Sequence, residues 1–563
     1  MKIENPRGER VAPIGPAASL EAGRAALGRG DWHAARLAFE RALQAEEHPE
    51  ALEGLGLAAW WLDLGDVVFD VRERAYRIYR ECGDSVGAAR VAVWIAWDTA
   101  AFRGETAIAN GWLQRAQRLL DGCPDAPEHA WLALRGGISA LLDDGDPLAA
   151  QKFAAAAVRV AKTVGSADYE LLGRALHGFA GVTAGHVAEG LQELDEVNAA
   201  VLAGEMTDRV LVALACCYLI AACERIRDYE RAVQWCDRLK AFCAKWGLRP
   251  LFAVCRTQYA SVCMWQEAEQ ELTAAAEQLS ACRPAMTVEG LVRLGELRRR
   301  QGRLAEAMAL FEAGGSHPLA SLGRASVTFD RGDVEGGADL AERHLRRLPA
   351  TNRTERAAAL ELMVRACVHQ GHIDKASRSV AELQAIASQA GTGPLRALAS
   401  LAAGLVAARS ADPTSARQHL EDAVDLFKES GAPFETGRAR VELARVMGRL
   451  GRADAAVDEV RRALDDLTPL GASLEVARAR TVLDALTASP APAPAAAGNA
   501  AGLTPRQVQI LRLIAGGSTN QAIGEQLFIS EHTVHRHVAN IFTTLNLSSR
   551  SAAVARAGRL GLL

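Results

Sequence analysis

Lysine is scarce in this chain of 563 residues: only seven are present, and none of them follows a glycine. A nucleotide-binding P-loop needs Gly-x-x-x-x-Gly-Lys-Ser/Thr, because the lysine contacts the phosphates. An ATPase module of that type is therefore excluded. His-Glu-x-x-His is absent as well, which removes a common metallohydrolase signature. We expect no enzyme activity and no cofactor.

Long apolar runs are also lacking. Hydrophobic residues make up 49% of the chain, yet no run approaches the roughly 20 residues that cross a bilayer. The first ten residues, Met1 to Arg10, contain no apolar stretch of the signal-peptide kind. We expect a cytoplasmic protein with no membrane partner.

The eleven cysteines include no Cys-x-x-Cys pair, although eight of them lie between Cys216 and Cys282. A secreted disulfide framework or a zinc site would show a different spacing. Two interpretations stay open for this stretch: a redox or metal sensor, or small side chains buried in helices. The missing Cys-x-x-Cys pair favours burial.

Charge is unevenly distributed along the chain. The whole chain has a net charge of −4, but residues 502–563 contain six arginines, no lysine, no aspartate and two glutamates. The tail therefore carries +4 and the remainder −8. A basic tail on an acidic body is typical of a protein that binds a polyanion at one end only.

Residues 19–486 repeat one pattern, and residues 1–18 precede it as an N-terminal tail. A glycine is followed after five positions by a small residue, and then after four and three more by apolar or small ones. This spacing places the side chains on one stripe of an α-helix, and the glycine supplies a left-handed turn. With a period of about 38 residues and no alternating strands, it predicts an all-α solenoid of helix pairs. The pattern starts at Gly30, Gly104, Gly185, Gly302, Gly371 and Gly451, and recurs without its glycine at Ala232, Ala268 and Ala416.

The stretch resembles tetratricopeptide repeats, most clearly from Gly30 to Leu43, with Pro49 closing the unit. The Gly65 unit departs from the pattern. The long, degenerate repeats are similar to those of large LuxR-family regulators of the maltose-activator type. The resemblance implies a concave surface for a small molecule or a protein partner. All ten tryptophans lie at or before Trp265, which fits either a ligand groove or packing between helices; packing is the more common role.

Alternating proline and alanine mark residues 487–501 as a semi-extended linker. After it, Thr504 and Pro505 predict the start of a helix that Gly516-Gly517 ends. Ser518 or Thr519 would cap a second helix and Ser530 a third. A fourth is expected from the Ser548-Ser549-Arg550 segment, with Ala552, Val554 and Ala557 on a small apolar face. The inward residues are expected to be Val508, Leu511, Ile514, Ile523, Leu527, Val534, Val538, Ile541 and Leu545.

The outer face of the third helix is the predicted contact surface for DNA. It carries His532, His535, Arg536, Ala539 and Thr543. Arg536 is the best candidate for a base contact, since its forked donors match guanine O6 and N7. The neighbours that suit phosphate contacts are Thr533, Asn540 and Thr544.

This tail, residues 502–563, resembles the LuxR-type helix-turn-helix. The matching segments include Leu503-Thr504-x-Arg506, Asn520-x-x-Ile523, and Thr533-Val534-x-x-His537-Val538-x-Asn540-Ile541. The resemblance implies a motif at about 520–539, with Asn520 in the DNA-binding set and base contacts at His535, Arg536 and Ala539. It also implies a dimer formed through the fourth helix on inverted half-sites.

Four positions depart from the family pattern: His535 and Thr544 stand where lysine is usual, Gln507 replaces a glutamate, and Gly524 replaces an alanine. Fewer cations predict weaker non-specific affinity for DNA and a shallower dependence on salt.

The sequence therefore predicts a tetratricopeptide-like solenoid followed by a four-helix LuxR-type domain, acting as a DNA-binding transcriptional regulator. The alternative is a protein-interaction scaffold with a degenerate helix-turn-helix. The expected partners are double-stranded DNA, a small-molecule or protein ligand on the solenoid, and RNA polymerase.

Overall fold

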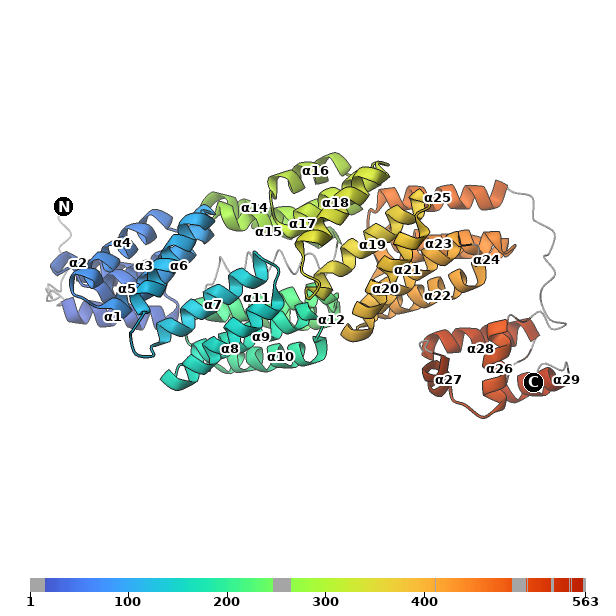
Figure 1. The fold of residues 1–563 in the computed structure, drawn as a ribbon, viewed down its shortest axis with the longest axis horizontal. Coiled ribbons are helices and arrows are strands. Elements are labelled where there is room, and N and C mark those ends of the chain that lie inside the picture. Colours follow the sequence, from blue (N-terminus) through green and yellow to red (C-terminus); the bar gives the residue numbers. More distant parts are fainter. Residues whose placement is uncertain are drawn as a thin grey trace, which may run out of the picture.

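The computed structural model describes residues 16–246, 265–410, 412–488, 503, 505–527, 531–545, 547 and 549–559. Helices are the only regular elements in these ranges. They form a long body of stacked helices and a small separate bundle at the C-terminal end (Figure 1). The all-α fold class and the tetratricopeptide-like arrangement of the body are thus confirmed.

The helices of the first half of the body are α1 (Pro16–Arg29), α2 (Trp32–Ala45), α3 (Pro49–Trp61), α4 (Gly65–Glu81), α5 (Ser85–Asp98), a π-helical turn η1 (Thr99–Arg103), α6 (Thr106–Leu120), α7 (Pro127–Leu142), α8 (Pro147–Val164), α9 (Ala167–Ala184), α10 (Val187–Ala203), α11 (Arg209–Ile226) and α12 (Tyr229–Trp246). Those of the second half are α14 (Trp265–Cys282), α15 (Pro284–Arg300), α16 (Leu304–Ala313), α17 (Pro318–Asp330), α18 (Val334–Arg347), α19 (Arg353–Gln370), α20 (Ile373–Ala390), α21 (Gly393–Arg409), α22 (Pro413–Glu429), α23 (Pro433–Arg449), α24 (Ala453–Leu467) and α25 (Ser473–Ala488).

The repeated pattern of the sequence marks the buried stripe of every second helix. In α2, Ala35, Phe39 and Ala42 are buried, and Gly30 before them takes a left-handed φ of 72°. The same left-handed turn is found at all six glycines that start the pattern. Where the pattern lacks its glycine before Ala232, the turn falls on Arg227, with a φ of 59°. A non-glycine residue in that conformation is uncommon, so the sequence did not reveal it.

Small residues on the stripe allow neighbouring helices to approach closely, as expected. A Cβ on Gly190 of α10 would lie 2.5 Å from the carbonyl oxygen of Gly178 in α9 and 2.9 Å from the backbone nitrogen of Val182. Backbone atoms cannot rotate out of the way as a side chain can, so the two helices would have to separate.

Gly190→Ala is therefore expected to lower the free energy of unfolding by about 1–3 kcal/mol, measured as a lower midpoint of thermal unfolding. Gly111→Ala is the matched control, because Gly111 lies inside α6 and a methyl group added there would meet no atom within 4 Å. That variant is expected to gain about 0.5–1 kcal/mol from helix propensity. Equal effects of the two substitutions would contradict the close approach of α9 and α10.

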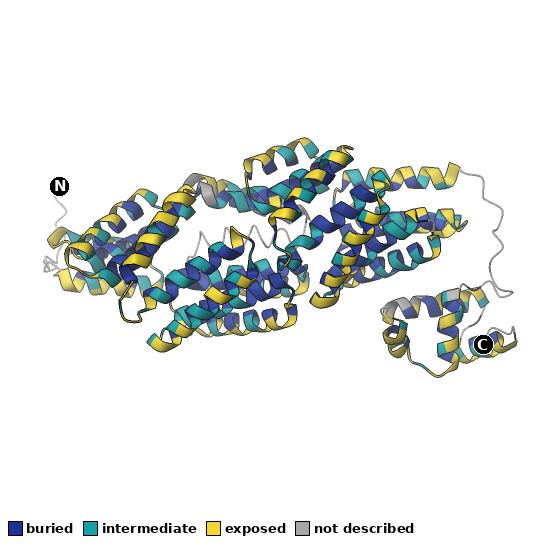
Figure 2. Cartoon of the chain, in the orientation of Figure 1, coloured by how far each residue is buried: buried dark blue, intermediate teal, exposed yellow. Residues whose placement is uncertain are grey.

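Contacts between distant helices close the body into a compact superhelix. Helix α19 touches both α9 and α11, and α15 touches η1 and α25. The Asn352 side-chain amide donates to the carbonyl of Gly145 at 3.0 Å, and Arg283 pairs with Asp63 at 2.6 Å. The buried residues accordingly follow the inner surfaces of the stack, while the outer faces are exposed (Figure 2). The superhelix is thus held by contacts between turns as well as by contacts between neighbours.

The tryptophans in the described part of the chain serve packing. Five of them are buried: Trp32, Trp60, Trp61, Trp94 and Trp131. Trp32 stacks on Trp61 with ring centroids 5.2 Å apart, and Trp131 stacks on Tyr169 at 5.9 Å. These rings fill the space between helices, which supports packing over a ligand groove.

The ends of the body lie close to their expected positions. Helix α1 begins at Pro16, before the expected start of the repeats at residue 19, and α25 continues to Ala488, into the expected linker. The rest of the linker lies outside the described residues. No helix in the described ranges is both long and apolar enough to span a bilayer.

Candidate nucleic-acid interface

The tail is a four-helix unit with its own core. Its helices are α26 (Pro505–Ala515), α27 (Asn520–Leu527), α28 (Glu531–Leu545) and α29 (Arg550–Arg559). A separate cluster of apolar side chains holds them together, and it contains all nine residues that the sequence placed on the inside. The inner stripe of the predicted helix-turn-helix is confirmed.

Two of the predicted helix starts can be checked. The Thr519 hydroxyl accepts a hydrogen bond from the Ala522 backbone at 3.2 Å, so Thr519 rather than Ser518 caps α27. Ser549 accepts in the same way from Ala552 at 3.2 Å and starts α29. Thr504, Ser530 and Ser548 lie outside the described residues. A hydroxyl that accepts from the N3 position satisfies one backbone donor that the helix itself leaves open.

The outer face of α28 is exposed wherever its side chains are described. His535, Ala539, Asn540 and Thr544 are all exposed, and the Thr543 hydroxyl donates to the Ala539 carbonyl at 3.0 Å. The helix thus brings four of the predicted contact residues to one solvent-facing surface.

Three further candidates on α28, Thr533, Arg536 and His532, have side chains that lie outside the described residues. Their backbone belongs to the helix. Position 536 precedes Ala539 and Asn540 by three and four residues, a spacing that puts it on the same face.

Asn520 does not lie on this face, and it has a structural contact. Its side-chain oxygen accepts from Arg550 Nη1 at 2.7 Å, and Arg550 Nη2 donates to the Ser518 carbonyl at 3.0 Å. Arg506 Nη2 similarly donates to the Leu527 carbonyl at 3.0 Å. Two of the six tail arginines therefore join helices within the tail, which charge counting had not distinguished. The Leu527 carbonyl belongs to the last turn of α27, where carbonyls lack intrahelical partners. Arg506 and Arg550 lie in the first turns of their own helices, so no local pattern indicates their partners.

The inner side of α28 also faces the solenoid. His537 is almost completely buried, and its Nε2 lies 4.0 Å from Glu421 Oε2 of α22. Burial lowers the pKa of Arg506, and the Asp422 carboxylate of α22 opposes that shift. The tail thus rests on α22 through one side, while the outer face of α28 stays exposed. The only feature of the sequence that indicates this docking role is a histidine, His537, on the inner half of an amphipathic helix.

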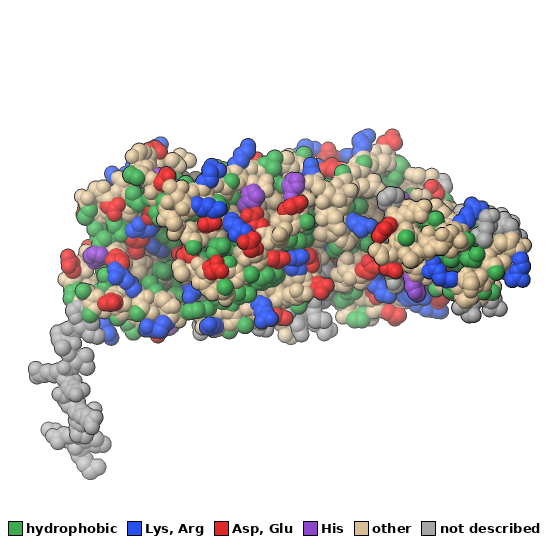
Figure 3. Space-filling model, turned by 90° about the horizontal axis from the view of Figure 1, so that it is seen from below, with side chains coloured by type: hydrophobic (Ala, Val, Ile, Leu, Met, Phe, Trp, Pro, Cys, Tyr) green, Lys and Arg blue, Asp and Glu red, His purple; other side chains and the backbone are tan. Residues whose placement is uncertain are grey.

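Positive side chains gather at the tail end of the molecule, whereas both signs are mixed over the solenoid (Figure 3). The exposed arginines there include Arg512, Arg556 and Arg559. This arrangement provides the cationic surface that phosphate binding requires.

The family description "Bacterial regulatory proteins, luxR family" matches residues 501–557. Residues 501–557 form a LuxR-type helix-turn-helix domain. In that domain, the chain is 49% identical over 57 residues to the transcriptional regulatory protein LiaR of Bacillus subtilis, a match that covers 10% of this chain and 27% of LiaR. It is 42% identical over 59 residues to the transcriptional regulatory protein DegU of Brevibacillus brevis, covering 10% of this chain and 25% of DegU.

The chain matches only about a quarter of the length of either relative, and the matches cover 10% of this chain. The chain is also similar to the solved structure of the APC/C hetero-tetramer Cut9-Hcn1, with a TM-score of 0.44 and 13% identity. That similarity covers 85% of this chain and 96% of the other.

The last helix of the LuxR-type domain contributes to the domain's own core. Ala553 and Ala557 are fully buried against the other helices, so Ala557 is not part of a free apolar face, contrary to the sequence analysis. Ala552 and Val554 are half-buried and keep part of their surface in solvent.

The cysteine-rich stretch behaves as a packing element where it is described. Cys216, Cys223 and Cys236 are buried, and no cluster of metal-ligating side chains is found among the described residues. Burial raises the pKa of the Cys223 thiol to about 12. Since the thiolate is the reactive form, Cys223 should be inert at neutral pH.

In the native protein, Cys223 is expected to resist iodoacetamide at pH 8, whereas the exposed Cys82 reacts. Peptide mapping by mass spectrometry separates the two, and denaturant should make Cys223 react as well. Alkylation of Cys223 at the rate of Cys82 without denaturant would restore the sensor hypothesis.

Proposed function

We propose that the protein is a sequence-specific DNA-binding transcriptional regulator. The observation that carries this proposal is the LuxR-type domain with an exposed outer face on α28. A helix of this kind enters the major groove, where each base pair presents a distinct pattern of donors and acceptors. The residues proposed to contact DNA are Thr533, His535, Arg536, Ala539, Asn540 and Thr544. Asn520 is proposed to contact DNA through its amide nitrogen alone, because its side-chain oxygen accepts a hydrogen bond from Arg550.

The proposed organisation assigns a different task to each part of the chain. The solenoid senses a ligand or docks a protein partner in the cytoplasm, and the linker of residues 489–501 tethers the domain that binds DNA. The domain binds as a dimer and acts through contact with RNA polymerase. The matched relatives are named as transcriptional regulators, which supports this assignment.

Genome-wide mapping of the full-length protein on chromatin tests the proposal. We expect a limited set of promoter sites that share an inverted repeat, and purified protein should bind them in the presence of excess non-specific DNA. Because few cations flank α28, non-specific binding should be weak and fall with rising salt. Uniform background with no enriched sites would favour the scaffold hypothesis instead.

A further inference from the structure

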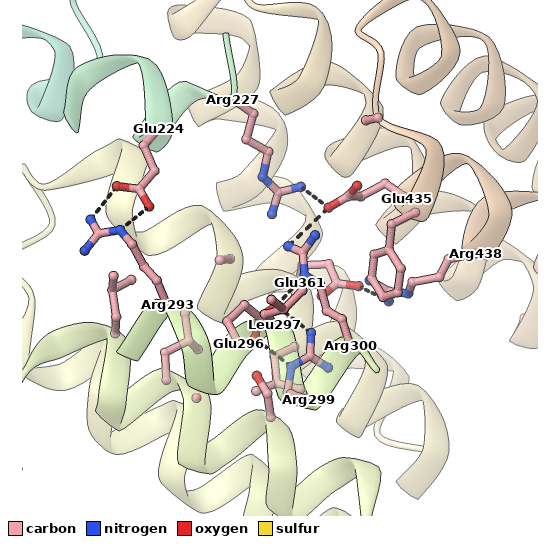
Figure 4. Close-up of a pocket in the computed structure, with 18 of the residues that line it drawn as sticks. Glu224, Arg227, Arg293, Glu296, Leu297, Arg299, Arg300, Glu361, Glu435 and Arg438 are labelled. Atoms are coloured by element: carbon pink, nitrogen blue, oxygen red, sulfur yellow. Dashed lines mark hydrogen bonds and ion pairs between the residues drawn. The ribbon is translucent and has the colours of Figure 1, made fainter. Parts of the chain in front are cut away.

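A cavity of about 480 Å³ lies inside the superhelix. Its walls come from α11, α15, α17, α19 and α23, so it joins the two halves of the solenoid (Figure 4). This volume falls within the range of small-molecule sites, which is about 300–1,000 Å³. No segment of the described chain fills it.

Arginines dominate the polar lining of this cavity. Six arginines and four glutamates line it. Arg293 is well satisfied, because it donates to both oxygens of Glu224 at 2.9 and 2.6 Å. Arg299 likewise binds Glu296 at 2.7 Å and Asp330 at 2.6 Å. These two guanidinium groups have their charge neutralised by close carboxylates.

The remaining arginines share carboxylates. Glu435 lies between Arg227 at 3.7 Å and Arg300 at 3.5 Å, both beyond good hydrogen-bond distance. Arg300 also pairs with Glu296 at 2.6 Å, so Arg299 and Arg300 share that carboxylate. The buried Nη1 of Arg227 has no hydrogen-bond partner among the described residues. Glu361 is likewise shared, by Arg365 and Arg438, each at 3.0 Å.

Among the lining residues, arginines outnumber glutamates by two. Glu289 and Asp330 offset this excess at Arg293 and Arg299, but not at Arg227. Burial lowers the pKa of Arg365; Glu361 opposes that shift, and the neighbouring Arg438 adds to it. An anion beside Arg227 would give its buried Nη1 an acceptor, and guanidinium groups bind carboxylates and phosphates with paired hydrogen bonds.

The cavity also offers an apolar wall. The Phe434 ring lies 4.8 Å from the Arg300 guanidinium and 5.9 Å from that of Arg438. Leucines from three helices continue this surface: Leu297, Leu322 and Leu362. A ligand that suits both walls has a charged head and an apolar body.

We propose that this cavity binds a small organic anion, with a carboxylate or phosphate head against Arg227 and Arg300 and an apolar body against Phe434 and the leucines. The inference rests on the proposed function, for which it names the chemical class of the effector.

A short path joins the cavity to the domain that binds DNA. Pro433, Phe434 and Glu435 form the first turn of α23 and line the cavity. Helix α22 packs along α23 and carries Glu421, which contacts His537 of α28. An anion that attracts Arg227 and Arg300 away from Glu435 changes the ion pairs at the start of α23. Only α22 lies between α23 and the docked LuxR-type domain. Binding of the anion should therefore change the affinity of the full chain for DNA.

Calorimetric titration of the full-length protein tests the proposal with three probes: 4-phenylbutyrate, phenyl phosphate and the neutral 4-phenylbutyramide. We expect saturable binding of at least one anion and roughly tenfold or more weaker binding of the amide. A preference between the two anions identifies the head group. Binding of neither anion up to about 10 mM, or equal binding of the amide, would overturn the proposal.

Three substitutions locate the site. Arg227→Gln should weaken anion binding roughly tenfold, whereas Glu435→Gln should strengthen it by removing the competing carboxylate. A misfolded variant could not show this gain. Arg461→Gln is the charge-matched control, because Arg461 is exposed on α24 and pairs with Asp458 of the same helix; it should leave binding unchanged. Identical behaviour of the Arg227 and Arg461 variants would also refute the site.

DNA binding measured on the same preparations separates the two proposals. Promoter binding without anion binding removes the cavity inference alone. Anion binding without promoter binding removes the regulator function and leaves the cavity as a ligand site.

Discussion

Replacing Arg536 with alanine is expected to weaken binding to the protein's own operator by about 1–3 kcal/mol, roughly 5- to 150-fold. The physical reason is the loss of a paired hydrogen bond to a guanine in the major groove. Position 536 lies on α28, on the face that carries the exposed Ala539 and Asn540. Electrophoretic mobility shift or fluorescence anisotropy on the mapped operator measures the effect, and specificity should relax at one base pair.

Arg559→Ala is the matched control for this experiment. Arg559 is exposed near the end of α29, so the variant removes the same charge from the same domain without touching α28. It should weaken specific and non-specific DNA binding alike, and only slightly. If Arg536→Ala binds as Arg559→Ala does, then α28 does not read bases through this side chain.

Replacing Arg283 with alanine is expected to destabilise the solenoid by about 3 kcal/mol, at the lower end of the range for a broken buried ion pair. The Arg283 side chain is fully buried, while that of Asp63 keeps 20% exposure, which limits the cost of leaving Asp63 unpaired. Arg283 also donates to the Trp60 carbonyl and lies 3.8 Å from the Trp60 ring. A single side chain thus joins α15 to the end of α3.

Thermal unfolding and amide hydrogen exchange measure this effect. Protection should fall first around α3 and α15, because the contact that closes the superhelix there is lost. Arg303→Ala provides the control: Arg303 is exposed and pairs with Glu306 three residues further on, so its loss should change the unfolding midpoint very little. An unchanged midpoint for Arg283→Ala would show that the superhelix does not depend on this contact.

The buried stripes of the solenoid could be predicted because they are local. Ala35, Phe39 and Ala42 follow a spacing that one helix imposes on its own sequence. The turn at Arg227 could not be predicted in this way. Its left-handed backbone depends on surrounding packing, since the intrinsic preference of arginine opposes it.

In the LuxR-type domain, too, the buried stripe was predictable from the sequence and the contacts between helices were not. Val534, Val538 and Ile541 were predicted to be buried, and they are. The bonds from Arg506 to the Leu527 carbonyl and from Arg550 to the Ser518 carbonyl were not predicted, because such partners are chosen by how helices cross. Charge counting treats all six arginines as equal, whereas the fold commits two of them to its own stability.

Helix content, repeat spacing and the LuxR-type domain follow from the amino-acid sequence itself, since each arises from the spacing of side chains along a few turns. Closure of the superhelix depends on residues more than 200 positions apart, such as Arg283 and Asp63. The arginine-lined cavity and the contact of His537 with Glu421 are likewise products of that closure. Only the tertiary structure decides them, because burial and pairing between distant charges are set by the path of the whole chain and not by any local pattern.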